Sequence, residues 1–329
     1  MIVCLIESPY QAFVLDQLVK QNKVNKKNLT IFVNDKNLEN GSFLESILAK
    51  LSFPYPNIFI IRKKIKSALP MGILFFKLFF SRTIIIGDIL SPWMGLIAKY
   101  FFFKRIILLE DGTSQFVDNK EIEEHIKNLD GVERYSLIGN ESLLSEAGSK
   151  IFKIDITDVQ INLSIPAFIS KIQDNPNLPL FFGAPIVSFN NYIQASYNKI
   201  CIDSLITLSS HEDGSPLAIY LKHRREIDSH LPDNFLKLES GGIDFALLEL
   251  CPKIQEEILK SRVIISFPST SLCILARGGL LRQVDEIKLI HITDLGYSFQ
   301  ERHNDLVTFV YNILKEEVVN VSIYKTRTT

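Results

Sequence analysis

Short runs of apolar residues alternate along the chain with longer amphipathic stretches. In the N-terminal half, the apolar runs predict strands at residues 2–6, 29–33, 57–62, 83–86 and 105–109. The stretches between them predict helices at residues 9–21, 42–51, 71–80 and 92–102. The runs are continuous rather than alternating, which is typical of strands in a parallel sheet that is covered on both faces. Strands and helices in this order indicate βαβ units.

A second series of the same kind begins near residue 178. It predicts strands at residues 180–187, 217–221, 235–238, 263–266 and 289–292. Residues 156–179 are rich in proline and are interpreted as a linker, so the predicted domains span residues 1–155 and 180–329. The last predicted helix, residues 300–317, could pack on either domain. The expected fold class is α/β, with two Rossmann-like doubly wound domains facing a cleft.

Length, charge and cysteine content limit the class of protein. A chain of 329 residues suffices for about two domains. The 36 basic and 37 acidic residues give a net charge of -1, which argues against a nucleic-acid binder. The four cysteines form no CxxC pair, which argues against a disulfide scaffold or a cysteine zinc site and fits a reducing compartment. No secretory signal and no run of about 18 apolar residues is visible, so a cytoplasmic location is predicted.

The first polar motif follows the strand at residues 2–6. Ser8 is placed to cap the next helix, and Pro9 suits its first turn. A well-formed helix start explains these residues. The alternative is that Gln11 and the free N–H groups of the helix face a ligand.

The second motif, Glu110-Asp111-Gly112, follows the strand at residues 105–109. Two adjacent carboxylates at the end of a buried strand are unfavourable unless they are solvated or paired. Either carboxylate could take a proton from an acceptor hydroxyl as a general base, while Gly112 permits a tight turn. An ordinary acidic turn explains the same residues equally well.

Two further motifs follow strands of the second predicted domain. The cationic motif consists of Lys222, His223 and Arg224, and the hydroxyl motif consists of Ser269, Thr270 and Ser271. Histidine and arginine can bind a phosphate group, and hydroxyls at a helix N-terminus form an anion site. A solvated basic strand end and a simple helix cap remain as alternatives. No P-loop, no GxGxxG after the first strand and no HExxH or DxD sequence occurs, so neither a nicotinamide cofactor nor a metal is expected.

Together these motifs resemble those of the bacterial GT-B sialyltransferases, above all the lipooligosaccharide sialyltransferase family (glycosyltransferase family 52). Related motifs occur in capsular polysialyltransferases. The resemblance depends, in chain order, on residues 4–11, Gly87-Asp88, Glu110-Asp111-Gly112, Lys222-His223 and Ser269-Thr270.

The resemblance implies an inverting, metal-independent transfer of sialic acid from CMP-sialic acid to a bacterial surface glycan. The acceptor would be a lipopolysaccharide, a lipooligosaccharide or a capsule precursor, and the donor is a substrate, so no cofactor is implied. Asp111 or Glu110 would be the base, and His223 would bind and protonate the departing CMP phosphate. Ser269 and Thr270 would hold that phosphate. The further residues expected to bind the CMP-sugar are Ser271, Lys222, Arg224, Gly112 and Gln11.

The chain departs from the family pattern in two places. Arg224 stands where a proline is expected after His223, and Asn190 and Asn191 stand where an acidic residue is expected. Three alternatives therefore stay open: transfer of another CMP-activated nonulosonic acid or Kdo, a non-catalytic polysaccharide-assembly protein, and a nucleotide-sugar epimerase. Whether the protein forms a homodimer is open as well.

Phenylalanine is unusually common, with 23 Phe against one Trp, and many of them lie between residues 73 and 103. Basic residues flank this segment. Helices and a strand directed into the core explain the pattern. The alternative is a basic, aromatic surface on the inner leaflet of the membrane, where anionic lipids attract cations, and this would make the protein peripheral on the inner face of the inner membrane.

Overall fold

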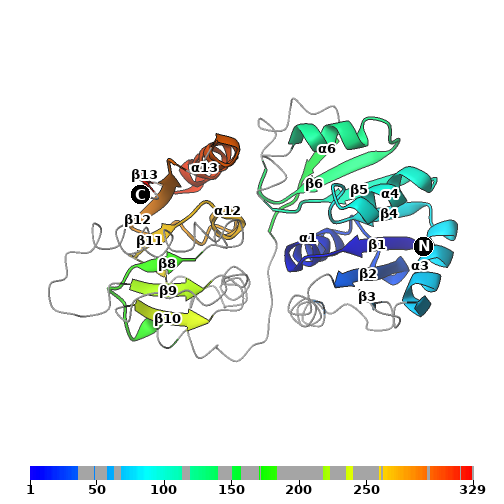
Figure 1. Ribbon diagram of the computed structural model, residues 1–329. Helices are drawn as coiled ribbons and strands as arrows, with labels where there is room; N and C mark the ends of the chain where they lie inside the picture. Colours follow the sequence, from blue (N-terminus) through cyan, green and yellow to red (C-terminus); the bar gives the residue numbers. More distant parts are fainter. Residues whose placement is uncertain are drawn as a thin grey trace. The chain divides into compact units, whose positions relative to one another are not determined.

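The chain forms two compact units, Met1–Thr157 and Asp158–Thr329. The computed structural model describes residues 1–35, 48, 58–62, 68–112, 119–139, 150–156, 170, 172–183, 218–222, 235–239, 259–260, 262–294, 297–318 and 320–327. The boundary between the units falls within the predicted linker at residues 156–179. Each unit contains a sheet with helices packed around it (Figure 1).

The described part of the first unit contains a seven-stranded sheet in which all neighbouring strands are parallel. The strands are β1 (Ile2–Ile6), β2 (Leu29–Asp35), β3 (Ile58–Arg62), β4 (Thr83–Ile86), β5 (Arg105–Leu109), β6 (Val132–Ser136) and β7 (Lys150–Lys153). Their order is β3-β2-β1-β4-β5-β6-β7. This is the doubly wound order, in which the chain builds outward from β1 in one direction and then from β4 in the other.

Helices cover both faces of this sheet. They are α1 (Pro9–Lys20), α3 (Ala68–Phe80), α4 (Pro92–Tyr100) and α6 (Asn119–Ile126), with a 3-10 turn η1 (Lys26–Asn28) before β2. Parallel crossovers are right-handed, so the reversal of direction places α1 on the face opposite α3 and α4. One apolar core joins α3, α4 and α6 to the sheet. It includes Val3, Leu5, Ile84, Ile86, Ile106 and Leu108 from strands, and Leu74, Leu78, Met94, Ile97, Ile122 and Ile126 from helices.

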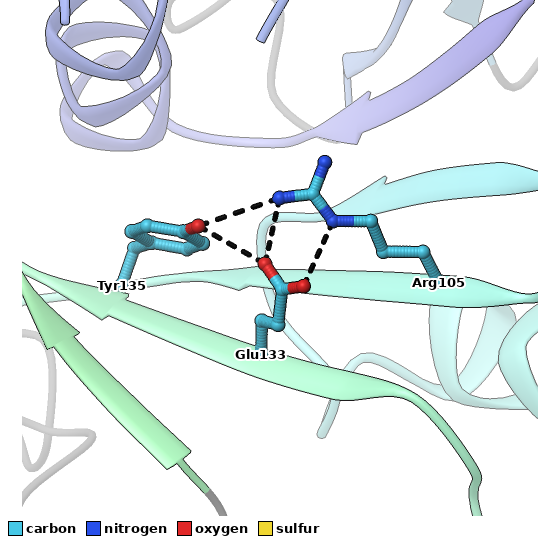
Figure 2. Close-up of polar contacts among 3 residues, drawn as sticks. All are labelled: Arg105, Glu133 and Tyr135. Carbon is cyan, nitrogen blue, oxygen red and sulfur yellow. Dashed lines mark hydrogen bonds and ion pairs between the residues drawn. The ribbon is translucent and has the colours of Figure 1, made fainter. Parts of the chain in front are cut away.

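β6 differs from the central strands because it contains two charged residues in succession, Glu133 and Arg134. On one face, Glu133 accepts hydrogen bonds from Arg105 Nε at 2.9 Å and Arg105 Nη2 at 2.7 Å, and from the Tyr135 hydroxyl at 3.0 Å (Figure 2). Arg134 forms an ion pair with Glu123 of α6 at 2.5 Å. Burial lowers the pKa of Arg134, and the negative charge of Glu123 opposes that shift. A strand with this composition contains no apolar run, which is why the hydrophobic pattern did not predict it.

The second unit repeats the arrangement with a six-stranded sheet, again parallel throughout its described part. The strands are β8 (Leu180–Phe182), β9 (Ala218–Lys222), β10 (Phe235–Glu239), β11 (Val263–Ser266), β12 (Glu286–Ile292) and β13 (Val321–Thr326), in the order β10-β9-β8-β11-β12-β13. Its helices include α12 (Thr270–Arg277) and α13 (Tyr297–Glu317). The last helix, α13, packs against α12 and β12 of this unit. Arg277 of α12 forms ion pairs with Glu316 at 2.8 Å and Glu317 at 3.0 Å of α13.

The segment that leads into β8 is attached to the second unit through one buried arginine. Arg262 Nη1 donates to the carbonyl oxygens of Asn175 at 3.0 Å and Leu178 at 2.9 Å, and Nη2 donates to that of Ile172 at 2.7 Å. Burial lowers the pKa of Arg262. Residues 172–178 were assigned to the linker, but these bonds hold them against the second unit.

The expected fold class, two Rossmann-like doubly wound α/β domains, is confirmed by the two parallel sheets. The limits of several elements differ from those predicted. Helix α4 ends at Tyr100 rather than at residue 102, because Phe101 has extended backbone angles (φ -106°, ψ 139°). The strands β6, β7 and β13 were not predicted. The predicted helix at residues 42–51 lies outside the described residues except for Leu48.

Candidate functional site

The sheet order reverses between β1 and β4 in the first unit and between β8 and β11 in the second. Doubly wound proteins bind ligands at the carboxyl ends of the strands beside such a switch point. In the first unit, residues 7–11 follow β1, residues 87–88 follow β4 and residues 110–112 follow β5. Side chains of residues 7–11 and 110–112 meet at this edge of the sheet, and Gly87 lies against the carboxamide of Gln11.

Asp111 is held in place by residues at the start of α1. Gln11 Nε2 donates to Asp111 Oδ1 at 2.6 Å, and the Ser8 hydroxyl donates to the same oxygen at 3.3 Å. Gln11 is itself fixed by a capping box, because its Oε1 accepts from the backbone N–H groups of Glu7 at 2.7 Å and Ser8 at 3.2 Å. The helix cap and the contact with the candidate base are therefore made by one amide group.

Two glycines permit this arrangement. Gly112, directly after Asp111, has φ +81°, a left-handed conformation that side chains other than glycine rarely adopt. Gly87 follows β4, and a Cβ at this position would overlap the carboxamide of Gln11. The Gly87-Asp88 strand end quoted from the sequence thus has a steric reason, because Gln11 occupies the space above Gly87.

Glu110 is completely buried, although it is the immediate neighbour of the half-buried Asp111. Its Oε1 accepts from the Tyr10 hydroxyl. Its Oε2 accepts from the Ser136 hydroxyl and from the backbone N–H of Ile138, the latter at 3.2 Å. Burial raises the pKa of Glu110 above its ordinary value, and the bonds from Ser136 and Tyr10 counteract that shift. Its two oxygens thus join β5 to α1 and to the end of β6.

A third carboxylate at this edge, Glu7, was not singled out from the sequence. Its Oε1 accepts from Asn34 Nδ2 at 2.7 Å, from the Ser91 hydroxyl at 3.0 Å and from the indole N–H of Trp93. Asn34 lies near the carboxyl end of β2, and Ser91 and Trp93 follow β4, so Glu7 connects the strand ends on both sides of β1. Its position directly after the first strand was the one signal in the sequence that could have marked it.

In the second unit, the hydroxyl motif lies at the corresponding switch point. Ser269 caps α12, because its side chain accepts from the backbone N–H of Leu272 at 3.3 Å. Thr270 and Ser271 form the first turn of the helix, and all three hydroxyl residues are half-buried. The hydroxyl motif therefore lies at the N-terminus of a helix that follows a buried strand, as predicted.

Lys222 is the last residue of β9, which neighbours β8, and β8 neighbours β11. Its backbone is therefore at the same carboxyl edge as Ser269. His223 and Arg224 lie outside the described residues, as do Asn190 and Asn191. Among the residues that the structure describes, no group of three or more His, Cys, Asp or Glu side chains could hold a metal ion.

In chemical terms, the first unit presents a half-buried carboxylate at the carboxyl edge of its sheet, and the second presents hydroxyls and N–H groups at the start of α12. The first could accept a proton, and the second could bind an anion. Of the ten predicted site residues, Gln11, Glu110, Asp111 and Gly112 meet in the first unit, and Ser269, Thr270 and Ser271 meet in the second.

Comparison with known proteins gives structural neighbours only. No family model matches the chain, and no curated protein matches it by sequence. A sialyltransferase from Photobacterium damsela is 13% identical, with a TM-score of 0.43 over 98% of this chain and 81% of that one. Anabaena HepE, solved in complex with UDP and glucose, is 9% identical, with a TM-score of 0.48 over 96% and 94% of the two chains. A glycosyltransferase from Rickettsia africae is 12% identical, with a TM-score of 0.43 over 96% of each chain.

Proposed function

We propose that the protein is a glycosyltransferase of GT-B type that moves sialic acid from CMP-sialic acid to a hydroxyl of a bacterial surface glycan. The reaction inverts the anomeric carbon and uses neither a metal nor a cofactor. The observation that supports this proposal best is the carboxylate of Asp111, fixed by Gln11 and Ser8 at the switch-point edge of a doubly wound sheet. The protein acts in the cytoplasm, where CMP-sugars are available to it.

Asp111 is the base in this proposal, and Glu110 is a positioning residue. A base must reach the proton that it removes. Both oxygens of Glu110 accept hydrogen bonds from the protein, and the residue is 0% exposed. Asp111 is half-buried and its Oδ1 is directed by the Gln11 amide, so this carboxylate is the one placed to approach an acceptor.

The donor phosphate is bound by the second unit. Ser269, Thr270 and Ser271 offer hydroxyls at the N-terminus of α12, where N–H groups and the helix dipole favour an anion. Lys222 ends β9, His223 and Arg224 come next in the sequence, and in this proposal the three add cationic contacts to the same phosphate. These groups neutralise the charge that collects on CMP as it leaves.

The proposed transfer forms one bond to the anomeric carbon and breaks another. The acceptor oxygen forms a bond to the anomeric carbon, and the bond from that carbon to the phosphate oxygen breaks. The electron pair of the broken bond leaves with CMP, and the acceptor proton passes to Asp111. Since the anomeric carbon ionises readily, positioning of the acceptor and stabilisation of the phosphate account for most of the acceleration.

The test is a turnover assay with purified protein and a panel of donors. The panel contains CMP-sialic acid, other CMP-activated nonulosonic acids, CMP-Kdo and UDP-sugars, with CMP or UDP release and product mass as readouts. Asp111→Asn is expected to reduce turnover about 10²–10⁴-fold with CMP affinity unchanged. Asp130→Asn, at an exposed carboxylate of the same unit, is the matched control and should retain full turnover.

Two results would contradict the proposal. CMP binding without turnover of any CMP-sugar would favour the non-catalytic assembly protein, for which the His223-Arg224 sequence is the supporting observation. Turnover of a UDP-sugar into its epimer would favour the epimerase. Preference for CMP-Kdo or another nonulosonic acid would keep the reaction class and change the donor.

A further inference from the structure

Helices α3 and α4 expose aromatic side chains on the surface of the first unit. The aromatic surface consists of Phe75, Phe76, Phe79, Phe80, Tyr100 and Phe102, whose exposed fractions range from 52% to 102%. Large rings at such exposure are rare on a monomer unless the patch has a binding role. The prediction that this segment is directed only into the core is therefore incomplete.

Several of the exposed rings of α3 contact one another. On α3, the ring centroids of Phe76 and Phe80 are 4.9 Å apart, and those of Phe79 and Phe80 are 5.5 Å apart. Phe75 of α3 contacts Phe101, directly after α4, at 6.4 Å. The inner side of α3 is apolar as well, since Leu74 and Leu78 lie in the core. Apart from Lys77, which donates to the Thr30 hydroxyl at 3.1 Å, residues 71–80 of α3 are apolar or glycine, and a helix surface of this kind is normally covered.

Three exposed cations lie close to the aromatic residues in the sequence. Arg82, Lys99 and Lys104 are exposed. The backbone N–H of Lys104 donates to the carbonyl of Arg82 at 2.9 Å, so these two cations lie together at the amino ends of β4 and β5. From residue 68 to residue 104 the only acidic residue is Asp88, at the opposite end of β4, where it accepts from the backbone N–H of Leu90.

We propose that the aromatic surface docks on an anionic lipid bilayer. Rings of this kind insert at the boundary between headgroups and acyl chains, and the cations contact the anionic headgroups. A second copy of the chain is the competing occupant. In a two-fold contact the same patch would face itself, and residues 68–104 offer no carboxylate at this end of the sheet to pair with its cations, which is unfavourable.

The docked orientation leaves the candidate site accessible. Arg82 and Lys104 mark the amino edge of the sheet, whereas Asp111 lies at the carboxyl edge. Strands of four or five residues separate the two edges by about 15 Å. The described part of the chain has no helix with the length and apolar character of a membrane span, so the contact is peripheral. This inference does not depend on the proposed reaction.

The test is flotation of the full chain with vesicles of phosphatidylcholine alone or mixed with phosphatidylglycerol, at low and high salt. Binding is expected only to the mixed vesicles, and it should weaken as salt is raised. Arg82→Glu/Lys99→Glu/Lys104→Glu should reduce the partition coefficient at least about 100-fold, since each cation near an anionic surface contributes about 1 kcal/mol. Phe76→Ser/Phe79→Ser should reduce it about tenfold or more.

Matched variants separate this surface from general charge and hydrophobicity. Lys23→Glu/Lys27→Glu/Lys127→Glu makes the same charge change at exposed positions elsewhere in the unit, and Phe152→Ser alters a partly exposed ring on β7. Both controls should bind as the unchanged chain does, and circular dichroism should show every variant folded. Three results would overturn the proposal: no binding at low salt, equal binding to both vesicles, or dimerisation in solution that Phe76→Ser/Phe79→Ser abolishes in a chain that binds no vesicle.

Discussion

The first unit departs from the usual distribution of side chains in two regions, and it does so in opposite ways. At the carboxyl edge of the sheet, Gln11 and Glu110 are polar but only 1% and 0% exposed. On the outer side of α3, Phe76 and Phe79 are apolar but 66% and 79% exposed. Buried polar groups and exposed large rings are the two exceptions that most often indicate function.

The two regions differ in what compensates for the unusual placement. Glu110 receives donors from Tyr10, Ser136 and Ile138, so the fold itself satisfies the buried carboxyl. The rings of α3 contact one another but stay in contact with water. Disturbing the carboxyl edge should therefore appear as lost stability and lost chemistry, whereas disturbing the aromatic surface should appear as lost binding.

The largest effect is expected from Glu110→Ala. It leaves the Tyr10 and Ser136 hydroxyls and the Ile138 N–H without their acceptor, and each unsatisfied buried group costs about 1–3 kcal/mol. The free energy of unfolding of the first unit should fall by roughly 3–5 kcal/mol. Urea denaturation followed by fluorescence of the single tryptophan, Trp93, measures it in this unit.

Two comparisons accompany that measurement. Glu110→Gln keeps one acceptor and should cost less than the alanine variant. Asp111→Ala, at a half-buried position, should cost less still. If Glu110→Ala and Asp111→Ala lowered the free energy of unfolding equally, the stability data would not distinguish a positioning residue at 110 from a base at 111.

A pair of substitutions on α3 tests the contrast between its two sides. Leu78→Ala opens a cavity in the core and should destabilise the first unit by about 3 kcal/mol, within the usual range of about 2–5 kcal/mol. Phe79→Ala, one residue further, removes an exposed ring and should change stability by no more than about 0.5 kcal/mol. The same Trp93 unfolding curves serve both variants. A large loss for Phe79→Ala would mean that the ring is packed in solution, which would argue against a free surface.

The contrast between the two regions also explains which parts of the fold could be predicted. The bounds of β1 and β5 were predicted as the structure has them, because both are uninterrupted apolar runs buried in the sheet. β6 and β13 were not predicted, because Glu133 and Arg134 in one and Ser322 and Lys325 in the other interrupt the apolar pattern. The charged side chains of β6 are satisfied by Arg105 of β5 and Glu123 of α6, which a local pattern does not contain.

Prediction of the candidate site was limited in the same way, because a local pattern does not show contacts between residues far apart in the sequence. Strand ends could be located from the sequence, so Gln11, Asp111 and Gly112 were expected at the site. Glu7 was not, because its donors Asn34 and Trp93 are 27 and 86 residues away along the chain. Only the order of the strands brings such residues together.

The half-buried His303 of the second unit allows a test of how stability depends on pH. His303 Nε2 accepts from the backbone N–H of Ile292 at 3.1 Å. Burial, assisted by the nearby His291, lowers the pKa of His303 from 6.5 to about 4. Between these pH values the unfolded chain binds a proton that the folded chain does not. Stability of the second unit is therefore complete above pH 6.5 and should fall by up to about 3 kcal/mol as the pH drops to 4.

Hydrogen exchange of peptides from β12 and α13 at several pH values measures this loss. His303→Gln retains an acceptor for the Ile292 N–H but does not titrate. In this variant, the protection of the β12 and α13 peptides from hydrogen exchange should depend less on pH than in the unchanged chain. Identical pH profiles for the two chains would show that other groups govern the acid sensitivity of this unit.

The smallest effect is expected from Gly87→Ala, which tests whether the carboxyl edge is as closely packed as its bonds imply. The added methyl would overlap Gln11 Oε1, which the N–H groups of Glu7 and Ser8 hold in place. Overpacking of this kind costs about 1 kcal/mol at the low end, and displacement of Gln11 should also lower turnover by moving Asp111. Gly72→Ala is the control, since a Cβ there meets nothing within 4 Å and should stabilise α3 by about 0.4–1 kcal/mol. If Gly87→Ala also stabilises the unit and keeps turnover, Gln11 moves freely and Asp111 does not depend on it.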